Sequence, residues 1–140
     1  MAALHSAYLP SQRRRKSSDM GKQDMHALAV RAFTLLIIGG VYWQIVCQVT
    51  GAREPWDADT YWYLWYPISC LLSAIAGILF RKKGWLAGGI ITFSQLPILW
   101  LNNGEGSLVA VGLLFLTLLA VPTIALSALA GWCAVRVRSA

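Results

Sequence analysis

Residues 54–66 combine three carboxylates with a dense group of aromatic side chains, which makes this the stretch best equipped for binding chemistry. Carboxylates attract cations, and aromatic faces hold a cation or stack on a sugar or peptide. The candidate ligand contacts are Glu54, Asp57, Asp59, Trp62, Trp65 and Tyr66. Trp and Tyr also gather where a protein crosses a lipid headgroup layer, and such a belt, with Trp43 and Trp100 at similar depth, needs no ligand. We favour the belt and keep a ligand site at this rim as the alternative.

A second set of candidate residues lies inside apolar segments and is polar but uncharged. Its members are Gln44, Gln48, Thr92 and Gln95. Three- and four-residue spacing places each of them on a stripe of small or polar residues along one helix face. The same pattern continues through Ser69, Ser73, Gly77, Gly88, Thr123, Ser127 and Gly131. We expect these stripes to face inward, because amides and hydroxyls that face lipid are left without partners.

Two roles are open for this polar stripe: a polar path or ligand site between helices, and hydrogen bonding that joins the helices. Ion-coupled transporters keep an ionisable side chain within the membrane as the coupling site. The stripe has no such group, so we favour hydrogen bonding between helices.

The motifs that mark catalysis, metal binding and nucleotide binding are missing from the sequence. His5 and His26 are the only histidines, and Cys47, Cys70 and Cys133 form no C-x-x-C pair. We expect the cysteines to behave as small hydrophobic residues. No serine lies in a G-x-S-x-G motif. The sequence therefore predicts no catalytic residue, no cofactor and no metal site, and a protein that is not an enzyme.

The composition indicates a membrane protein. Of 140 residues, 57% are hydrophobic and 13% charged, with a mean hydropathy of +0.56, whereas soluble domains carry roughly 25% charged residues. So short a chain cannot bury this much apolar surface within itself. The net charge of +6 would suit nucleic acid, but the basic residues lie at the ends of apolar segments rather than on one face, so we expect no nucleic-acid partner.

The apolar segments and turn residues predict an all-α fold, a four-transmembrane-helix bundle of two sequential helical hairpins. Residues 25–138 form the transmembrane domain, with helices over residues 25–49, 61–80, 85–101 and 108–135. The last helix exceeds a perpendicular span and should tilt or bend at Pro122.

Residues 1–24 show no helical or strand period and are expected to form a basic, disordered cytoplasmic tail. Met20 and Met25 leave a later start of translation open. A basic start followed by an apolar run also suits a secretory signal peptide, but the apolar run is longer than the roughly 7–15 residues usual there.

Basic residues cluster in three places that alternate with the apolar segments. They are Arg13, Arg14, Arg15, Lys16, Arg81, Lys82, Lys83, Arg136 and Arg138. Cytoplasmic segments of membrane proteins are rich in Lys and Arg. A topology with both termini in the cytoplasm places all three clusters on that side and leaves Arg53 outside, so we predict this orientation in a membrane of the bacterial inner type.

These observations predict a small multi-pass integral membrane protein that acts as a structural or accessory component through helix packing. The alternative is an oligomeric transporter or flippase of small or lipid-linked molecules, with the aromatic rim as its entry site. The expected partners are the lipid bilayer and either further copies of the chain or a larger membrane protein.

Overall fold

The computed structural model describes the backbone of residues 2–103 and 108–137, and the side chains of residues 20–102 and 110–137. Every regular element in these ranges is a helix, so the all-α prediction is confirmed. The chain divides into two units, Met1–Arg31 and Ala32–Ala140. Helix α1 (Ala2–Thr50) contributes to both.

The first unit is helical from Ala2, whereas we expected a disordered tail over residues 1–24. The segment is rich in Ala, Leu, Arg, Lys and Gln, which have high helix propensity. A helix that continues from an apolar segment also avoids the cost of a new nucleus. Among residues 20–31, every side chain except that of Leu28 is exposed.

Three helical segments of the described chain are long and apolar enough to cross a membrane: Met20–Asp57, Tyr61–Lys83 and Ala110–Val137. The predicted span over residues 85–101 is divided instead into α3 (Trp85–Phe93) and α4 (Gln95–Asn103), each of nine residues. At 1.5 Å per residue, such a helix is about 14 Å long and cannot cross a hydrocarbon core of about 30 Å by itself.

The division between α3 and α4 follows from Pro97. A continuous helix would pair the amide of residue 97 with the carbonyl of Phe93, but proline has no amide proton and its ring clashes with that carbonyl. Helix α3 accordingly ends at Phe93. Ser94 forms the turn, with φ −65° and ψ −8°.

The segment between α1 and α2 contains two short helical turns, η1 (Pro55–Asp57) and η2 (Tyr61–Trp65), before α2 (Tyr66–Phe80). Turn η2 is π-helical, and the amide of Tyr66 donates to the carbonyl of Tyr61, five residues earlier. Pro67 lacks the donor for a regular bond to Tyr63, which favours this wider turn. Together η2 and α2 cover the predicted helix over residues 61–80.

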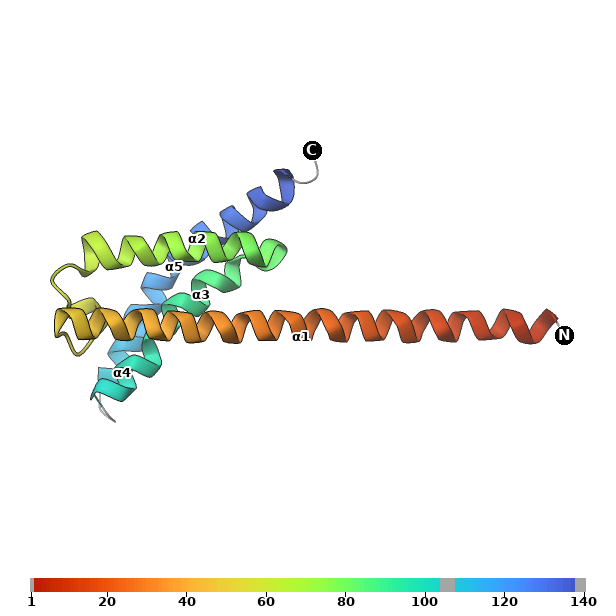
Figure 1. Ribbon diagram of the computed structural model, residues 1–140, viewed down its shortest axis with the longest axis horizontal. Helices are drawn as coiled ribbons and strands as arrows, with labels where there is room; N and C mark the ends of the chain where they lie inside the picture. The colour runs from red at the N-terminus through yellow and green to blue at the C-terminus, as the bar shows by residue number, and fades with distance from the viewer. Residues whose placement is uncertain (1, 104–107, 138–140) are drawn as a thin grey trace. The chain divides into compact units, whose positions relative to one another are not determined.

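Helix α5 (Leu108–Val137) packs against both α2 and α3 (Figure 1). Near its start, Gly112 faces Trp56 and Leu99. Near its end, Gly131 faces the carbonyl of Arg81 in the turn η3 (Arg81–Lys83), which joins α2 to α3. Helix α5 therefore extends from the aromatic segment at one end of the second unit to the basic turn at the other.

Close approach of helix backbones holds α2, α3 and α5 together. A Cβ added at Gly77 would overlap the backbone of Ser127, and one added at Gly88 would overlap the backbone of Thr123. Small residues allow such contacts between membrane helices. The outer face of α5 is apolar, and Leu114, Leu118 and Val121 are exposed by 75%, 69% and 63%. This distribution suits helices surrounded by lipid or by other apolar helices.

Candidate functional site

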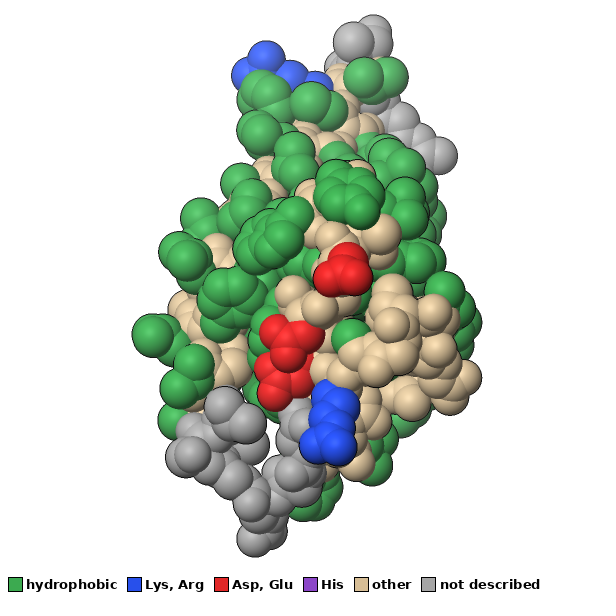
Figure 2. Space-filling model, turned by 90° about the vertical axis from the view of Figure 1, so that its left-hand side faces the viewer, with side chains coloured by type: hydrophobic (Ala, Val, Ile, Leu, Met, Phe, Trp, Pro, Cys, Tyr) green, Lys and Arg blue, Asp and Glu red, His purple; other side chains and the backbone are tan. Residues whose placement is uncertain are grey.

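The acidic and aromatic candidates lie together on the segment that joins α1 to α2. Asp57 and Asp59 are exposed and Glu54 is half-buried. Figure 2 shows acidic side chains among hydrophobic ones on this face of the molecule. Trp62 is 55% exposed, whereas Trp65 and Tyr66 are half-buried.

Most polar groups of these aromatic residues are already bonded within the protein. The Trp65 indole donates to the Thr60 hydroxyl at 2.8 Å. The Tyr66 hydroxyl donates to the Leu119 carbonyl at 2.9 Å, and the Tyr42 hydroxyl donates to the Trp65 carbonyl at 2.7 Å. These bonds tie the aromatic segment to α5 and α1, so Trp65 and Tyr66 hold the bundle together whether or not the rim binds a ligand.

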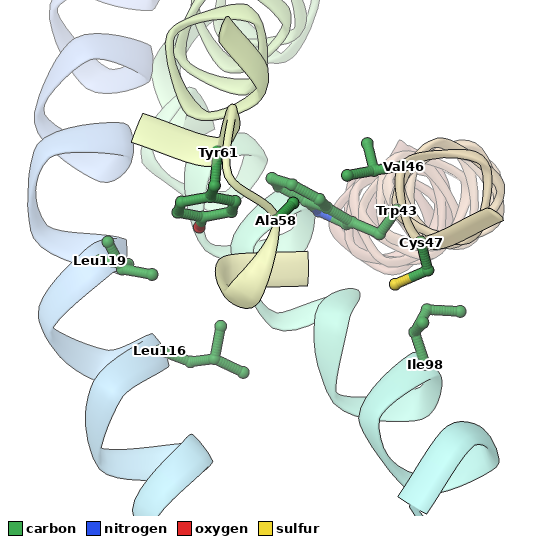
Figure 3. Close-up of a cluster of buried hydrophobic side chains, with 8 residues drawn as sticks. All are labelled: Trp43, Val46, Cys47, Ala58, Tyr61, Ile98, Leu116 and Leu119. Carbon is green, nitrogen blue, oxygen red and sulfur yellow. The ribbon is translucent and has the colours of Figure 1, made fainter. Parts of the chain in front are cut away.

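Two aromatic residues expected in the interfacial belt, Trp43 and Tyr61, are instead fully buried. Their ring centroids lie 5.7 Å apart. Figure 3 shows Trp43 projecting from α1 toward Tyr61, in a cluster that includes Leu116 and Leu119 of α5. The rings of Tyr61 and Tyr66 stack at 5.7 Å. The aromatic segment therefore contributes to the buried core, whereas Trp62 and Trp100 are exposed.

Of the four residues of the polar stripe, Thr92 and Gln95 are buried, Gln44 is half-buried and Gln48 is exposed. On α1 the buried face runs through Gly39, Trp43 and Val46, which turns Gln48 outward. The structure thus brings Thr92 and Gln95 into the interior and leaves Gln48 out of it.

Thr92 is engaged in helix packing. Its hydroxyl lies 2.8 Å from the hydroxyl of Thr123 on α5. The amide of Gly88, one turn earlier, donates to the Ser127 hydroxyl at 3.1 Å. This amide is among the first four of α3, which have no carbonyl partner within their own helix. As predicted for the small and polar stripes, Thr123 and Ser127 face inward, and both are fully buried.

Side chains also satisfy the backbone where α3 ends. The Ile91 carbonyl accepts the Trp43 indole N–H at 2.9 Å and the Ser94 hydroxyl at 2.6 Å. Non-helical backbone at membrane depth is tolerated where protein groups replace the lost bonds. Trp43 thereby links α1 to the break between α3 and α4.

Gln95 begins α4 and is 0% exposed. Neither atom of the Gln95 amide nor the Tyr61 hydroxyl reaches hydrogen-bonding geometry with any described residue. The carbonyl oxygen of the Gln44 side chain is likewise buried and unpartnered within the described chain. Among the described side chains, these are the buried polar atoms for which no hydrogen bond is found.

The basic candidates described by the structure lie at the other end of the second unit. Arg81, Lys82 and Lys83 are exposed in η3, and the Arg136 guanidinium lies 4.3 Å from the centroid of the Trp132 ring. Arg138 lies outside the described residues, as do the side chains of Arg13, Arg14, Arg15 and Lys16.

The described side chains form no metal-binding cluster and no disulfide. No group of three or more His, Cys, Asp or Glu residues there is arranged to hold a metal ion. The three cysteines form no disulfide among the described residues. Cys47 is buried, Cys70 is half-buried and Cys133 is exposed. Cys133 therefore differs from the small hydrophobic core residue that we expected.

We compared the chain with models of known protein families, with curated proteins and with solved structures, and none of the three comparisons gives a match.

Two of the residues that matter most to this arrangement, Trp43 and Tyr61, were assigned to the interfacial belt and not to the buried core. Pro97 signals the break between α3 and α4 and leaves the Phe93 carbonyl without its helical amide. Trp43 donates instead to the Ile91 carbonyl, two residues earlier, so the proline did not point to the burial of Trp43 or Tyr61.

Proposed function

We propose that this chain is a multi-pass integral membrane protein that acts as a structural or accessory component through its outer helix faces. The observation that carries the proposal is the use of polar and small residues inside the bundle. Thr92 bonds to Thr123, and Gly88 packs on the backbone of Thr123. The polar side chains between α3 and α5 thus bond within the bundle, whereas the exposed faces of α2 and α5 are apolar.

In the proposed topology, α3 and α4 together make one broken crossing between the spans that contain α2 and α5. Their combined length, at 1.5 Å per residue, is close to the roughly 30 Å of the hydrocarbon core. Both termini then lie on one side of the membrane.

The proposed orientation has that side facing the cytoplasm of a bacterial-type inner membrane. Arg81, Lys82, Lys83 and Arg136 gather at one end of the second unit, and Asp57 and Asp59 lie toward the other. Cytoplasmic segments favour Lys and Arg, and exposed Trp85 and Trp132 suit the headgroup layer at that end.

A transporter or flippase is the second candidate, favoured by the break between α3 and α4. Transporters often bind substrate beside discontinuous helices near the middle of the membrane. Gln95 lies at this break, and its buried amide has no hydrogen-bond partner among the residues that the structure describes. The exposed Trp62 ring and its acidic neighbours would then form the entry site.

Purification in a mild detergent, with mass determination and identification of copurifying proteins, separates the two candidates. The accessory role predicts a complex of fixed stoichiometry with a different, larger membrane protein. A stable homo-oligomer with no other protein bound would contradict that role and favour transport.

A further inference from the structure

The end of the second unit that lies opposite the acidic segment carries a group of exposed cations, which we call the basic patch. Its members are Arg81, Lys82 and Lys83 in η3 and Arg136 near the end of α5, and all four are exposed. The elements that form this end, α2, η3, α3 and α5, contain no Asp or Glu. Clustered charges of one sign attract a partner of the opposite sign. The basic patch therefore suits an anion.

Glycine packing holds the backbone of η3 against α5. Gly131 on α5 faces the carbonyl of Arg81, and Gly84, which follows the turn, faces the carbonyl of Ser127. The amide of Gly84 donates to the Arg81 carbonyl at 2.8 Å. Both glycines are buried, whereas the three basic side chains of the turn are exposed. The turn is thus fixed on its backbone side and presents its charges outward.

Arg81 has a backbone conformation that disfavours side chains. Its φ is 52° and its ψ is −118°, and no other non-glycine residue that the structure describes has a positive φ. Glycine adopts such a conformation without steric cost, whereas arginine does not. Residues that persist in strained conformations are concentrated at binding sites. The arginine is therefore better explained by what its guanidinium binds than by the shape of the turn.

The residues around the basic patch indicate a lipid as the source of the anion. Trp85 and Trp132 are 53% and 54% exposed, and tryptophan is enriched at the headgroup layer. The Arg136 guanidinium lies over the Trp132 ring, where it still has N–H donors for a phosphate group. Ile78 and Leu79, one turn before η3, are 49% and 65% exposed. An apolar surface next to the cations suits acyl chains, which free phosphate lacks.

We propose that the basic patch binds the phosphate group of an anionic phospholipid. Basic groups between helices at one membrane surface are suited to such headgroups. A zwitterionic lipid carries the same phosphate, but its ammonium group cancels the charge that the patch attracts. The site goes beyond the proposed function. It requires the location in a membrane, but neither the accessory role nor the orientation of the chain.

Native mass spectrometry of the full chain in a mild, uncharged detergent tests the site. Phosphatidylglycerol and phosphatidylcholine with the same acyl chains are titrated in turn. We expect phosphatidylglycerol to bind at least about five-fold more tightly, the gain that one basic residue near a membrane surface gives. Equal affinities for the two lipids would overturn the proposal. Displacement of the lipid by inorganic phosphate, but not by chloride of equal ionic strength, would overturn the lipid as the partner.

The variant Arg81→Gly separates lipid binding from folding. Glycine suits a φ of 52°, so the melting temperature should be unchanged or higher. The affinity for phosphatidylglycerol should fall about five-fold, because one charge is lost. Arg53→Gln removes a charge at the other end and should leave this affinity unchanged. An affinity that Arg81→Gly does not lower, or an equal loss in Arg53→Gln, would overturn the proposal.

A second variant decides the outcome if Arg81→Gly lowers the stability. Lys82→Gln combined with Lys83→Gln changes two exposed side chains of the same turn. We expect this double variant to lower the affinity for phosphatidylglycerol by more than about five-fold, because two charges are lost. An unchanged affinity in the double variant would overturn the proposal.

Discussion

The hydroxyl of Thr92 on α3 lies 2.8 Å from the hydroxyl of Thr123 on α5, and both side chains are buried. Thr123 also lies 3.0 Å from the carbonyl of Ala120, within its own helix. Both hydroxyls are thus used to hold helices in place. A polar residue inside a membrane bundle can be explained by packing before a transport path is invoked.

Removal of this hydroxyl pair should show coupling between α3 and α5. We expect the Thr92→Val and Thr123→Val variants to give a coupling free energy of about 0.6–1.7 kcal/mol, the range found for hydrogen bonds between membrane helices. The measurement is a double-mutant cycle on the free energy of unfolding in a mild detergent. Strictly additive effects of the two substitutions would show that the hydroxyl pair contributes nothing to the bundle.

Two adjacent glycines of α3 should respond in opposite ways to the same substitution. Gly88→Ala places a methyl group against the Thr123 backbone and should destabilise the protein by at least about 1–3 kcal/mol, the usual cost of overpacking. Gly89→Ala is the control, because its Cβ would lie 3.8 Å from the Ile124 side chain, an ordinary contact. Alanine also favours the helix over glycine by about 1 kcal/mol. Equal melting temperatures of the two variants would rule out the close contact between α3 and α5.

The bond from Trp43 to the Ile91 carbonyl should stabilise the break between α3 and α4. Trp43→Phe removes the indole donor but leaves the Ser94 hydroxyl on that carbonyl. We expect a loss of about 1–3 kcal/mol, and a larger loss than the sum of the single effects when Ser94→Ala is added, because the carbonyl then loses both side-chain donors. Chemical unfolding measures these losses. The control is Trp62→Phe, which should change the free energy of unfolding little because Trp62 is exposed. A loss as large as that of Trp43→Phe would show that the bond from Trp43 does not stabilise the break.

The basic turn between α2 and α3 should determine orientation. With a reporter that is active only outside the cytoplasm fused after Ala140, we expect no activity in the wild-type protein. Replacing Arg81, Lys82 and Lys83 together by Gln should produce a measurable active fraction, because Lys and Arg keep a segment in the cytoplasm. The control variant Arg53→Gln, which changes a basic residue of the acidic segment, should produce no active fraction. An active reporter on the unmodified chain would reverse the proposed topology.

The sequence was sufficient to predict the helical fold and most of the buried stripes. Ser69, Ser73, Thr123 and Ser127 are enclosed as their spacing indicated, since a period of three to four residues directly reports one helix face. The long helix over residues 61–80 was also evident, because an apolar run of that length has few alternatives in a membrane.

Features that depend on contacts between distant segments could not be predicted in this way. Hydropathy is the same for a continuous helix as for the pair α3 and α4, and only the chemistry of Pro97 separates them. Trp43 and Trp62 likewise look equivalent in sequence, yet one is buried and the other is 55% exposed.

The central claim is that the outer helix faces bind another membrane protein, and crosslinking in the intact membrane tests it most directly. A photoreactive amino acid would replace in turn Leu71 and Leu79 on α2, and Leu114 and Leu118 on α5, all of which are exposed. We predict that one helix face gives a crosslink to a single, different protein and that the other gives lipid adducts. Lipid adducts alone, or crosslinks only between copies of this chain, at all four positions would contradict the claim.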